Sequence, residues 1–124
     1  MKITHIITDL DTGGAEIMLC KLLASLHDDK ALNSTVISLM GRGKITEQIE
    51  ALGVKVETLD LGQGERPSWQ TIKKLRQCMR TFNPDIVQGW MYHGNIAATV
   101  AVFLFDPMRR KVKLFWNVRQ TLYD

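Results

Sequence analysis

The sequence lacks the features that mark several special classes of protein. It has two cysteines, Cys20 and Cys78, and no C-x-x-C pair, so neither a disulfide framework nor a zinc site is expected. Both fall at apolar positions of expected helices, which favours buried free thiols in a reducing cytosol. The longest apolar stretch, Ile96 to Phe105, is broken by Thr99 and is far shorter than the roughly 20 residues that cross a bilayer. We therefore expect a cytoplasmic protein, or at most one that lies peripherally on the inner face of the plasma membrane.

Acidic residues are scarce in the second half of the chain. Residues 1–62 carry 6 basic and 9 acidic side chains, whereas residues 63–124 carry 10 basic and 4 acidic ones. Two basic groups, within 73–80 and at 109–111, could dock on an anionic membrane surface, although a solvated helix face explains them at least as well. Nucleic acid is a poorer partner, because the aromatic residues do not interleave with the basic ones.

Short strands alternate with amphipathic helices along all 124 residues, a length that suits one domain. The expected strands are Ile3 to Asp9, Thr35 to Met40, Val54 to Leu59, Asp85 to Gly89 and Val112 to Val118. The expected helices are 15–26, 45–52, 69–82 and 93–105. This alternation predicts a single Rossmann-like α/β domain: a doubly wound parallel sheet of about five strands between helices on both faces. Because no helix follows the fifth strand, we expect a sheet that is incomplete at its C-terminal end and a chain that is part of a longer protein.

Several residues predict where these elements begin and end. Gly53 is the kind of residue that adopts the left-handed conformation after a helix. Ser68 is a predicted helix cap. Asn83 precedes a proline and is therefore expected to end the third helix. The strand at Val54 to Leu59 carries polar residues at alternate positions and is expected near a sheet edge.

Ligands of open α/β sheets bind beyond the carboxyl ends of the strands. There, Gly13 and Gly14 directly precede a helix, so backbone N–H groups and the helix dipole could receive a phosphate or diphosphate. A tight turn without a ligand explains the two glycines at least as well.

The segment Gly89 to Asn95 is the second candidate site, because it gathers Trp, Tyr, His and Asn at a strand end and a helix start. Aromatic faces and polar donors suit sugar rings, and a helix N-terminus favours a neutral His93 that can act as a base or donor. The alternative is a capped helix with a buried tryptophan and a structural histidine. Arg119 follows the fifth strand on the same edge and could bind an anion. His5 and His27 are expected to be structural.

Three rival functions fit the sequence less well. An NAD-binding domain would need G-x-G-x-x-G and an acid after the second strand, and both are missing. A receiver-type phosphorylation domain could use Asp9, Asp11 and Asp60, but it would need a lysine at the end of the fifth strand. Asp9-Leu10-Asp11 also spells the D-x-D of metal-dependent glycosyltransferases, and we interpret that match as accidental.

Taken in order, four segments resemble the N-terminal domain of family 4 (group 1 type) glycosyltransferases of the GT-B fold. They are Ile3 to Ile7, Gly13 to Glu16, Pro84 to Asn95 and Phe115 to Arg119. The likeness runs from residue 1 to about residue 123. It implies two Rossmann-like domains with the active site between them, of which this chain is the acceptor-side one, while the donor-binding C-terminal domain lies outside this sequence.

The resemblance also implies an activity and a set of site residues. Such enzymes are retaining and move a sugar from a nucleotide-sugar donor to an acceptor, here a bacterial cell-surface polysaccharide or a lipid-linked glycan, without a metal or another cofactor. Gly13 and Gly14 would then approach the donor diphosphate. His93 would be the catalytic residue, and Tyr92, Asn95 and Arg119 would bind the acceptor or sugar. The chain alone would be inactive. The alternative function is a stand-alone phosphate-binding or receiver-type signalling domain.

Overall fold

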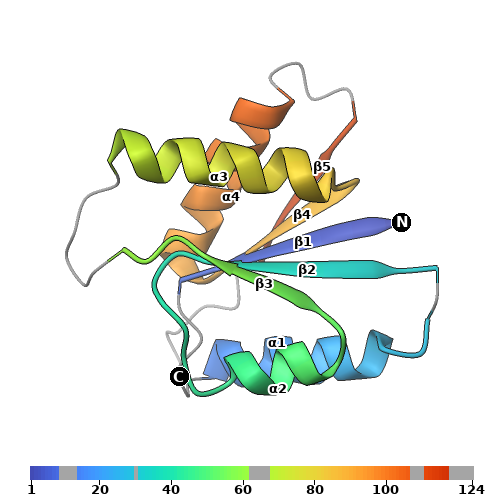
Figure 1. The fold of residues 1–124 in the computed structure, drawn as a ribbon. Helices are drawn as coiled ribbons and strands as arrows, with labels where there is room; N and C mark the ends of the chain where they lie inside the picture. The colour runs from blue at the N-terminus through green and yellow to red at the C-terminus, as the bar shows by residue number, and fades with distance from the viewer. Residues whose placement is uncertain (9–13, 30, 62–67, 107–110, 118–124) are drawn as a thin grey trace.

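The computed structural model describes residues 1–8, 14–29, 31–61, 68–106 and 111–117, and these residues contain one parallel sheet of five strands (Figure 1). The spatial order is β3-β2-β1-β4-β5, so the chain first builds outward from β1 in one direction and then in the other. The strands are β1 Lys2–Ile7, β2 Asn33–Ser38, β3 Lys55–Thr58, β4 Ile86–Trp90 and β5 Lys113–Asn117. This arrangement confirms the predicted Rossmann-like α/β class.

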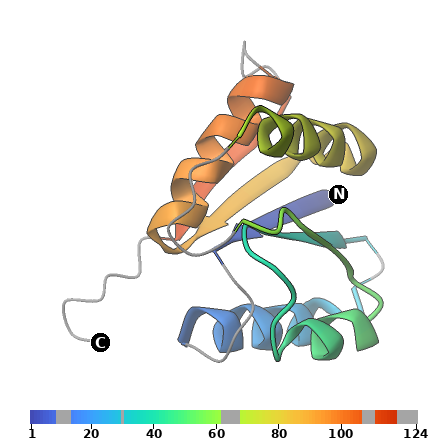
Figure 2. The same ribbon diagram turned by 60° about the vertical axis from the view of Figure 1, so that its left-hand side comes forward.

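Within the described residues, four helices cover the two faces of the sheet. Helices α1 (Gly14–Leu26) and α2 (Thr46–Ala51) lie on one face, and α3 (Trp69–Phe82) and α4 (Met91–Phe105) lie on the other (Figures 1 and 2). The side switches after β3, because the chain must return past β1 to place β4 on its other side. The result is the three-layer α/β/α arrangement that the sequence predicted.

Alternating residues of the central strand β1 supply two separate hydrophobic cores. Ile6 points into the core under α3 and α4, where it is buried with Ile37, Met79 and Val102. Its neighbour Ile7 points the opposite way. The second core, under α1 and α2, also contains Leu19, Leu23, Val36, Ile45, Ile49 and Trp90. Both faces of the sheet are therefore apolar, as a buried parallel sheet requires.

The structure confirms the residues that were predicted to mark the ends of helices. Ser68 caps α3 through a capping box in which its hydroxyl accepts from the backbone N–H of Thr71 at 3.3 Å. Asn83 ends α3 in the left-handed conformation, with a φ of 49°. Gly53 follows α2 with a φ of 83°. Strand β3 lies at the edge of the sheet, as its alternating polarity predicted.

Two predictions about burial and boundaries need correction. Helix α4 begins at Met91 and not at His93, because Trp90 is the last residue of β4 and also occupies the N-cap position of α4. Cys78 is a buried free thiol as expected, but Cys20 is only partly buried, because it lies on the flank of α1.

The opposite edge of the sheet is formed by β5. Phe115 and Trp116 point to opposite faces of this strand, and each is 51% exposed. Among the described helices, none combines the length and the apolar character that crossing a bilayer requires.

Candidate functional site

Between β1 and β4 the direction in which the chain adds strands to the sheet reverses. These two strands are adjacent and parallel, with Ile7 paired to Trp90 at their carboxyl ends. From this edge the chain enters α1 on one face and α4 on the other (Figure 2). The crevice between two such strands is where open α/β sheets bind ligands. Segment 89–95 therefore lies at the carboxyl end of β1, the strand that precedes α1 and its first residue, Gly14.

Two glycines allow the first turn of α4 to pack directly on the sheet at this point. A Cβ atom at Gly94 would lie 2.7 Å from the carbonyl oxygen of Ile6 and 3.2 Å from Cα of Ile7. One at Gly89 would lie 2.6 Å from Oδ1 of Asn95. Real Cβ atoms do not approach so closely, so larger residues here would push the helix off β1 and β4. The motif contained both glycines, but their packing role requires contacts between residues far apart in sequence.

Gly14 begins α1 and has a different environment. A Cβ atom there would meet nothing within 4 Å, and its φ is not positive. Neither crowding nor backbone conformation therefore calls for glycine, which is a poor helix former. The first turn of α1 therefore presents its N–H groups, which have no partner within the helix, without a side chain at position 14. Gly13 lies outside the described residues.

Asn95 is the candidate sugar-binding residue whose side chain the structure describes. It is 9% exposed and lies over Gly89, at the inner side of the first turn of α4. Its backbone carbonyl accepts a hydrogen bond from Thr99 Oγ1 at 3.0 Å. The backbones of Tyr92 and His93 lie in the same helical turn, but the structure describes neither side chain. Arg119 lies outside the described residues.

Trp90 is buried beneath the site and does not face it. Its side chain is 3% exposed, and its Nε1 donates a 3.1 Å hydrogen bond to Nδ1 of His5. Burial lowers the pKa of His5 from 6.5 to about 4, so this imidazole is neutral near pH 7. The structural interpretation of His5 is confirmed. Trp90, by contrast, belongs to the core under α1 and α2, so its ring is not a platform for a sugar.

Two polar residues, one directly after β1 and one in the first turn of α1, were assigned no role in the sequence interpretation. Thr8 follows β1 directly, and within the described residues its buried Oγ1 has no hydrogen-bond partner. Glu16 lies in the first turn of α1 and is 3% exposed. A hydroxyl in this position can donate to a ligand, and a buried acid can accept from one. The position of Thr8 after a buried strand was the available signal, because ligands gather at strand ends.

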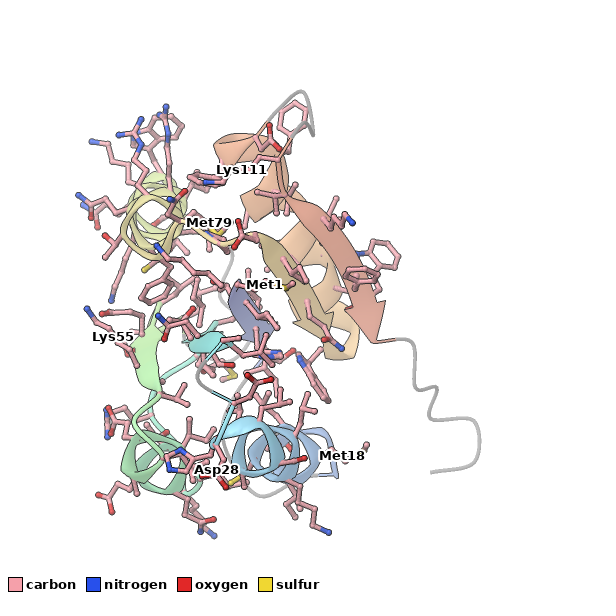
Figure 3. All side chains as sticks on the ribbon, turned by 90° about the vertical axis from the view of Figure 1, so that its right-hand side faces the viewer. Met1, Met18, Asp28, Lys55, Met79 and Lys111 are labelled. Atoms are coloured by element: carbon pink, nitrogen blue, oxygen red, sulfur yellow. The ribbon has the colours of Figure 1, made fainter. Side chains whose placement is uncertain are left out.

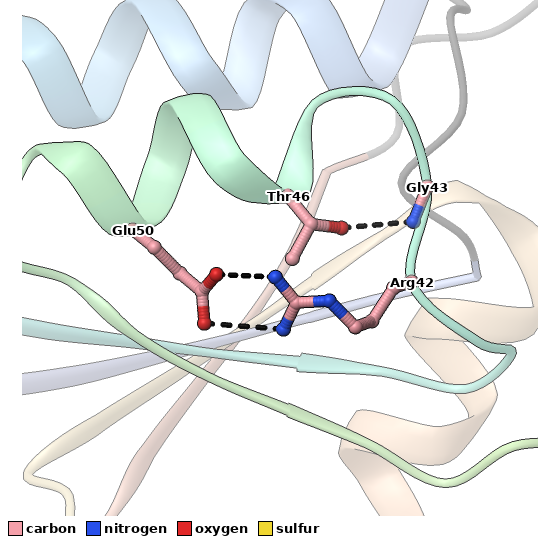
Figure 4. A network of polar contacts seen from close by, with 4 residues as sticks. All are labelled: Arg42, Gly43, Thr46 and Glu50. Carbon is pink, nitrogen blue, oxygen red and sulfur yellow. Dashed lines mark hydrogen bonds and ion pairs between the residues drawn. The ribbon is translucent and has the colours of Figure 1, made fainter.

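The loop after β2 is held against α2, the helix that follows it. Arg42 forms a two-pronged ion pair with Glu50 of α2, in which Nη1 and Oε2 are 3.2 Å apart (Figure 4). The Arg42 hydrogen bond lowers the pKa of the Glu50 carboxyl. The backbone N–H of Gly43 donates to Thr46 Oγ1 at 2.8 Å. This loop carries no acid of the kind that holds the ribose of NAD, in agreement with the sequence.

The receiver-type interpretation is wrong, because the strand order differs from that class. Receiver domains have the order 2-1-3-4-5, which places the third strand next to the first. Here β2 lies between β1 and β3, so Asp60 is remote from the end of β1. Asp60 instead accepts from Thr58 at 3.1 Å and pairs with Lys74 at 3.7 Å. Asp9 and Asp11 lie outside the described residues, and within those residues no cluster of His, Cys, Asp and Glu could hold a metal ion.

A protein described as a UDP-N-acetylglucosamine 2-epimerase from Listeria monocytogenes shares this fold. The two structures match with a TM-score of 0.54 and 21% sequence identity over 82% of this chain. The match covers 27% of the other protein, so the chain spans about a quarter of its length. No protein-family model matches the chain, and no curated protein matches its sequence. At this identity the likeness establishes the fold, in agreement with the strand order.

Proposed function

We propose that this chain is the N-terminal, acceptor-side domain of a retaining glycosyltransferase of the GT-B fold. The complete enzyme would move a sugar from a nucleotide-sugar donor to a cell-surface polysaccharide or a lipid-linked glycan. A C-terminal domain would hold the nucleotide. The observation that carries the proposal is the packing of Gly94 directly on the backbone of β1, because it places the first turn of α4 at the end of the strand that leads to α1. The fold neighbour, whose name includes a nucleotide sugar, supports the same substrate class.

The start of α1 is proposed to bind the donor diphosphate. Gly13 and Gly14 would let the phosphate oxygens approach the backbone N–H groups, and the helix dipole would favour their negative charge. The open space at Gly14 supports this role, since nothing within the described residues explains the absence of a side chain there. Thr8 Oγ1, buried at the end of β1, adds a hydroxyl that can donate to the same group.

The first turn of α4 is proposed to hold the sugars. His93 would be the catalytic residue, with Tyr92 and Asn95 binding the acceptor or the transferred sugar, and Arg119 contributing from the chain after β5. In the transfer, the bond from the anomeric carbon to the phosphate breaks, and the phosphate leaves with its electron pair. The acceptor hydroxyl forms the new bond and loses its proton. A neutral imidazole at a helix N-terminus can accept or relay that proton, and no residue of this set needs a metal or a further cofactor.

Amide NMR of the chain can test the diphosphate site directly. We expect millimolar UDP-N-acetylglucosamine or UDP to shift the amide signals of Gly14 and of the first turn of α4. Gly14→Ala should weaken this binding severalfold while the fold is kept, because its methyl group would project into the ligand's place. Gly41→Ala is the matched control, since its methyl group would make ordinary contact with Asp60 at 3.6 Å, beyond β2.

The possible outcomes distinguish the proposal from its alternative. Equal shifts with inorganic phosphate and with UDP would favour a general phosphate-binding domain. If Gly14→Ala and Gly41→Ala bind UDP as the wild type does, the diphosphate role of α1 is wrong. The chain alone should show no sugar transfer, because the proposed donor-binding domain is not part of it; turnover by this chain would contradict the two-domain proposal.

A further inference from the structure

Helix α3 carries positive charge and no negative charge. Its 14 residues include Lys73, Lys74, Arg76 and Arg80 but neither aspartate nor glutamate. Lys74 is turned toward β3, where it pairs with Asp60. The other three basic side chains are exposed, and among the described residues none of them has an ion-pair partner. Three uncompensated cations thus remain on the outer surface of one helix.

These three cations lie in a single row with a tryptophan. Trp69, Lys73, Arg76 and Arg80 are spaced by four, three and four residues, which places them along one face of α3. The opposite face is buried against the sheet and α4 through Leu75, Cys78, Met79 and Phe82. The row spans most of a helix about 21 Å long. We call Trp69, Lys73, Arg76 and Arg80 the α3 row.

Lys111 continues the row past the end of the helix. Its ammonium group donates a hydrogen bond to Asn83, the residue that caps α3, and lies 5.7 Å from the ring centre of Phe105. Figure 3 shows the charged side chains of α3 extending away from the molecule, with Lys111 beside them. The basic surface is therefore formed by two segments, α3 and the residues before β5, that are far apart in sequence.

Trp69 is the most exposed large apolar side chain described, at 71%. An indole at the end of a row of cations suits a membrane interface, where the ring enters the headgroup region while the cations meet anionic lipid. A single-stranded nucleic acid would instead call for aromatic rings between the cations, and the α3 row has one ring at its end. The row also lies on a convex helix surface and not in a groove that could track a strand.

We infer that the α3 row and Lys111 bind the surface of an anionic lipid bilayer, with Trp69 at the headgroup level. The chain would then be held peripherally, on the inner face of the plasma membrane if the protein is cytoplasmic. This inference does not rest on the proposed function, since the row lies on the outside of α3 and the crevice lies between β1 and β4. The inferred membrane-binding surface is smaller than the basic surface expected from the sequence, because Arg109 and Arg110 lie outside the described residues and are not included.

Vesicle co-sedimentation of the chain tests this inference. At low salt we expect binding to phosphatidylcholine vesicles that contain phosphatidylglycerol, no binding to pure phosphatidylcholine, and loss of binding at high salt. Each basic residue near an anionic surface adds to the free energy of membrane binding. The double variant Arg76→Gln/Arg80→Gln, which removes two such residues, should therefore bind about tenfold or more weakly. Lys21→Gln/Lys44→Gln removes the same charge from exposed residues on the other side of the sheet and should bind almost as the wild type does.

Tryptophan fluorescence provides the second measurement. Binding should shift the emission to shorter wavelength, and Trp69→Phe should remove most of that shift, because Trp90 is buried and Trp116 lies on β5. Equal binding to neutral vesicles, equal weakening by the control variant, or a shift that survives in Trp69→Phe would each overturn the inference. So would an absence of vesicle binding at low salt, and tight binding to a single-stranded oligonucleotide would then assign the row to nucleic acid.

Discussion

Trp90 donates its indole N–H to Nδ1 of His5 across the buried interior, although the two residues are 85 positions apart in sequence. The bond joins the middle of β1 to the last residue of β4, directly before α4 begins. It also determines which imidazole nitrogen carries the proton, because Nδ1 must be the acceptor. The hydrogen bond to His5 thereby fixes the carboxyl end of β4, the strand that leads into the candidate site.

This pair predicts that the protein loses stability on mild acidification. The pKa of His5 is about 4 when folded and near 6.5 when unfolded, so the unfolded chain binds more protons between those values. The free energy of unfolding should therefore fall as the pH drops from about 6.5 to about 4, by about 3 kcal/mol from this residue. Urea unfolding at a series of pH values measures the loss.

His5→Asn is the matched variant for that experiment. The asparagine oxygen can accept the Trp90 N–H in place of Nδ1, but it does not titrate. The stability of the variant should change less with pH over the same range. If the free energy of unfolding of His5→Asn depends on pH as strongly as that of the wild type, other groups cause the acid sensitivity.

Gly94→Ala should destabilise the protein by about 1–3 kcal/mol. The new methyl group would lie 2.7 Å from the carbonyl oxygen of Ile6, which is backbone and cannot rotate away. The better helix propensity of alanine returns at most about 1 kcal/mol. A lower urea midpoint with an unchanged slope would show the effect. Gly41→Ala, with its nearest contact at 3.6 Å, should leave the midpoint almost unchanged; an equal loss in both variants would contradict the packing argument.

Ser68→Ala should cost about 1 kcal/mol of stability. The substitution removes the hydroxyl that accepts from the N–H of Thr71 and breaks the capping box of α3. Gln70→Ala, at an exposed position in the first turn of the same helix, is the control and should change stability by less than about 0.5 kcal/mol. Thermal unfolding of the two variants makes the comparison. Equal stability of both would show that α3 begins independently of its cap.

The two thiols should react at very different rates with iodoacetamide. Cys78 is 7% exposed and burial raises the pKa of its thiol, so both access and thiolate population are low. Cys20 is partly exposed on α1 and should be alkylated first in the native protein. Mass spectrometry should find one label before unfolding and two after it. Rapid native labelling of Cys20→Ser would mean that Cys78 is accessible.

Local signals in the sequence were sufficient for the elements and many of their ends. Strand and helix periodicity located all nine elements that the structure describes. Ser68, Asn83 and Gly53 marked boundaries because capping and left-handed conformations depend on neighbouring residues. The sequence also placed candidate site residues at strand ends, since that rule needs only the order of strands and helices. The start of α4 was missed by two residues, because Trp90 serves both β4 and the helix cap.

Only the tertiary structure decided which of those residues share a site. The order β3-β2-β1-β4-β5 separates Asp60 from β1 and brings the start of α4 beside it, and no local pattern encodes which strands become neighbours. Burial of Trp90 against His5 depends on a contact across 85 residues, so its sequence neighbours suggested a sugar platform that the fold does not provide. The need for glycine at position 94 likewise arises from the backbone of β1 beneath it. Local chemistry determined the elements and their ends, while contacts between distant segments determined the crevice, because packing depends on residues that the sequence keeps apart.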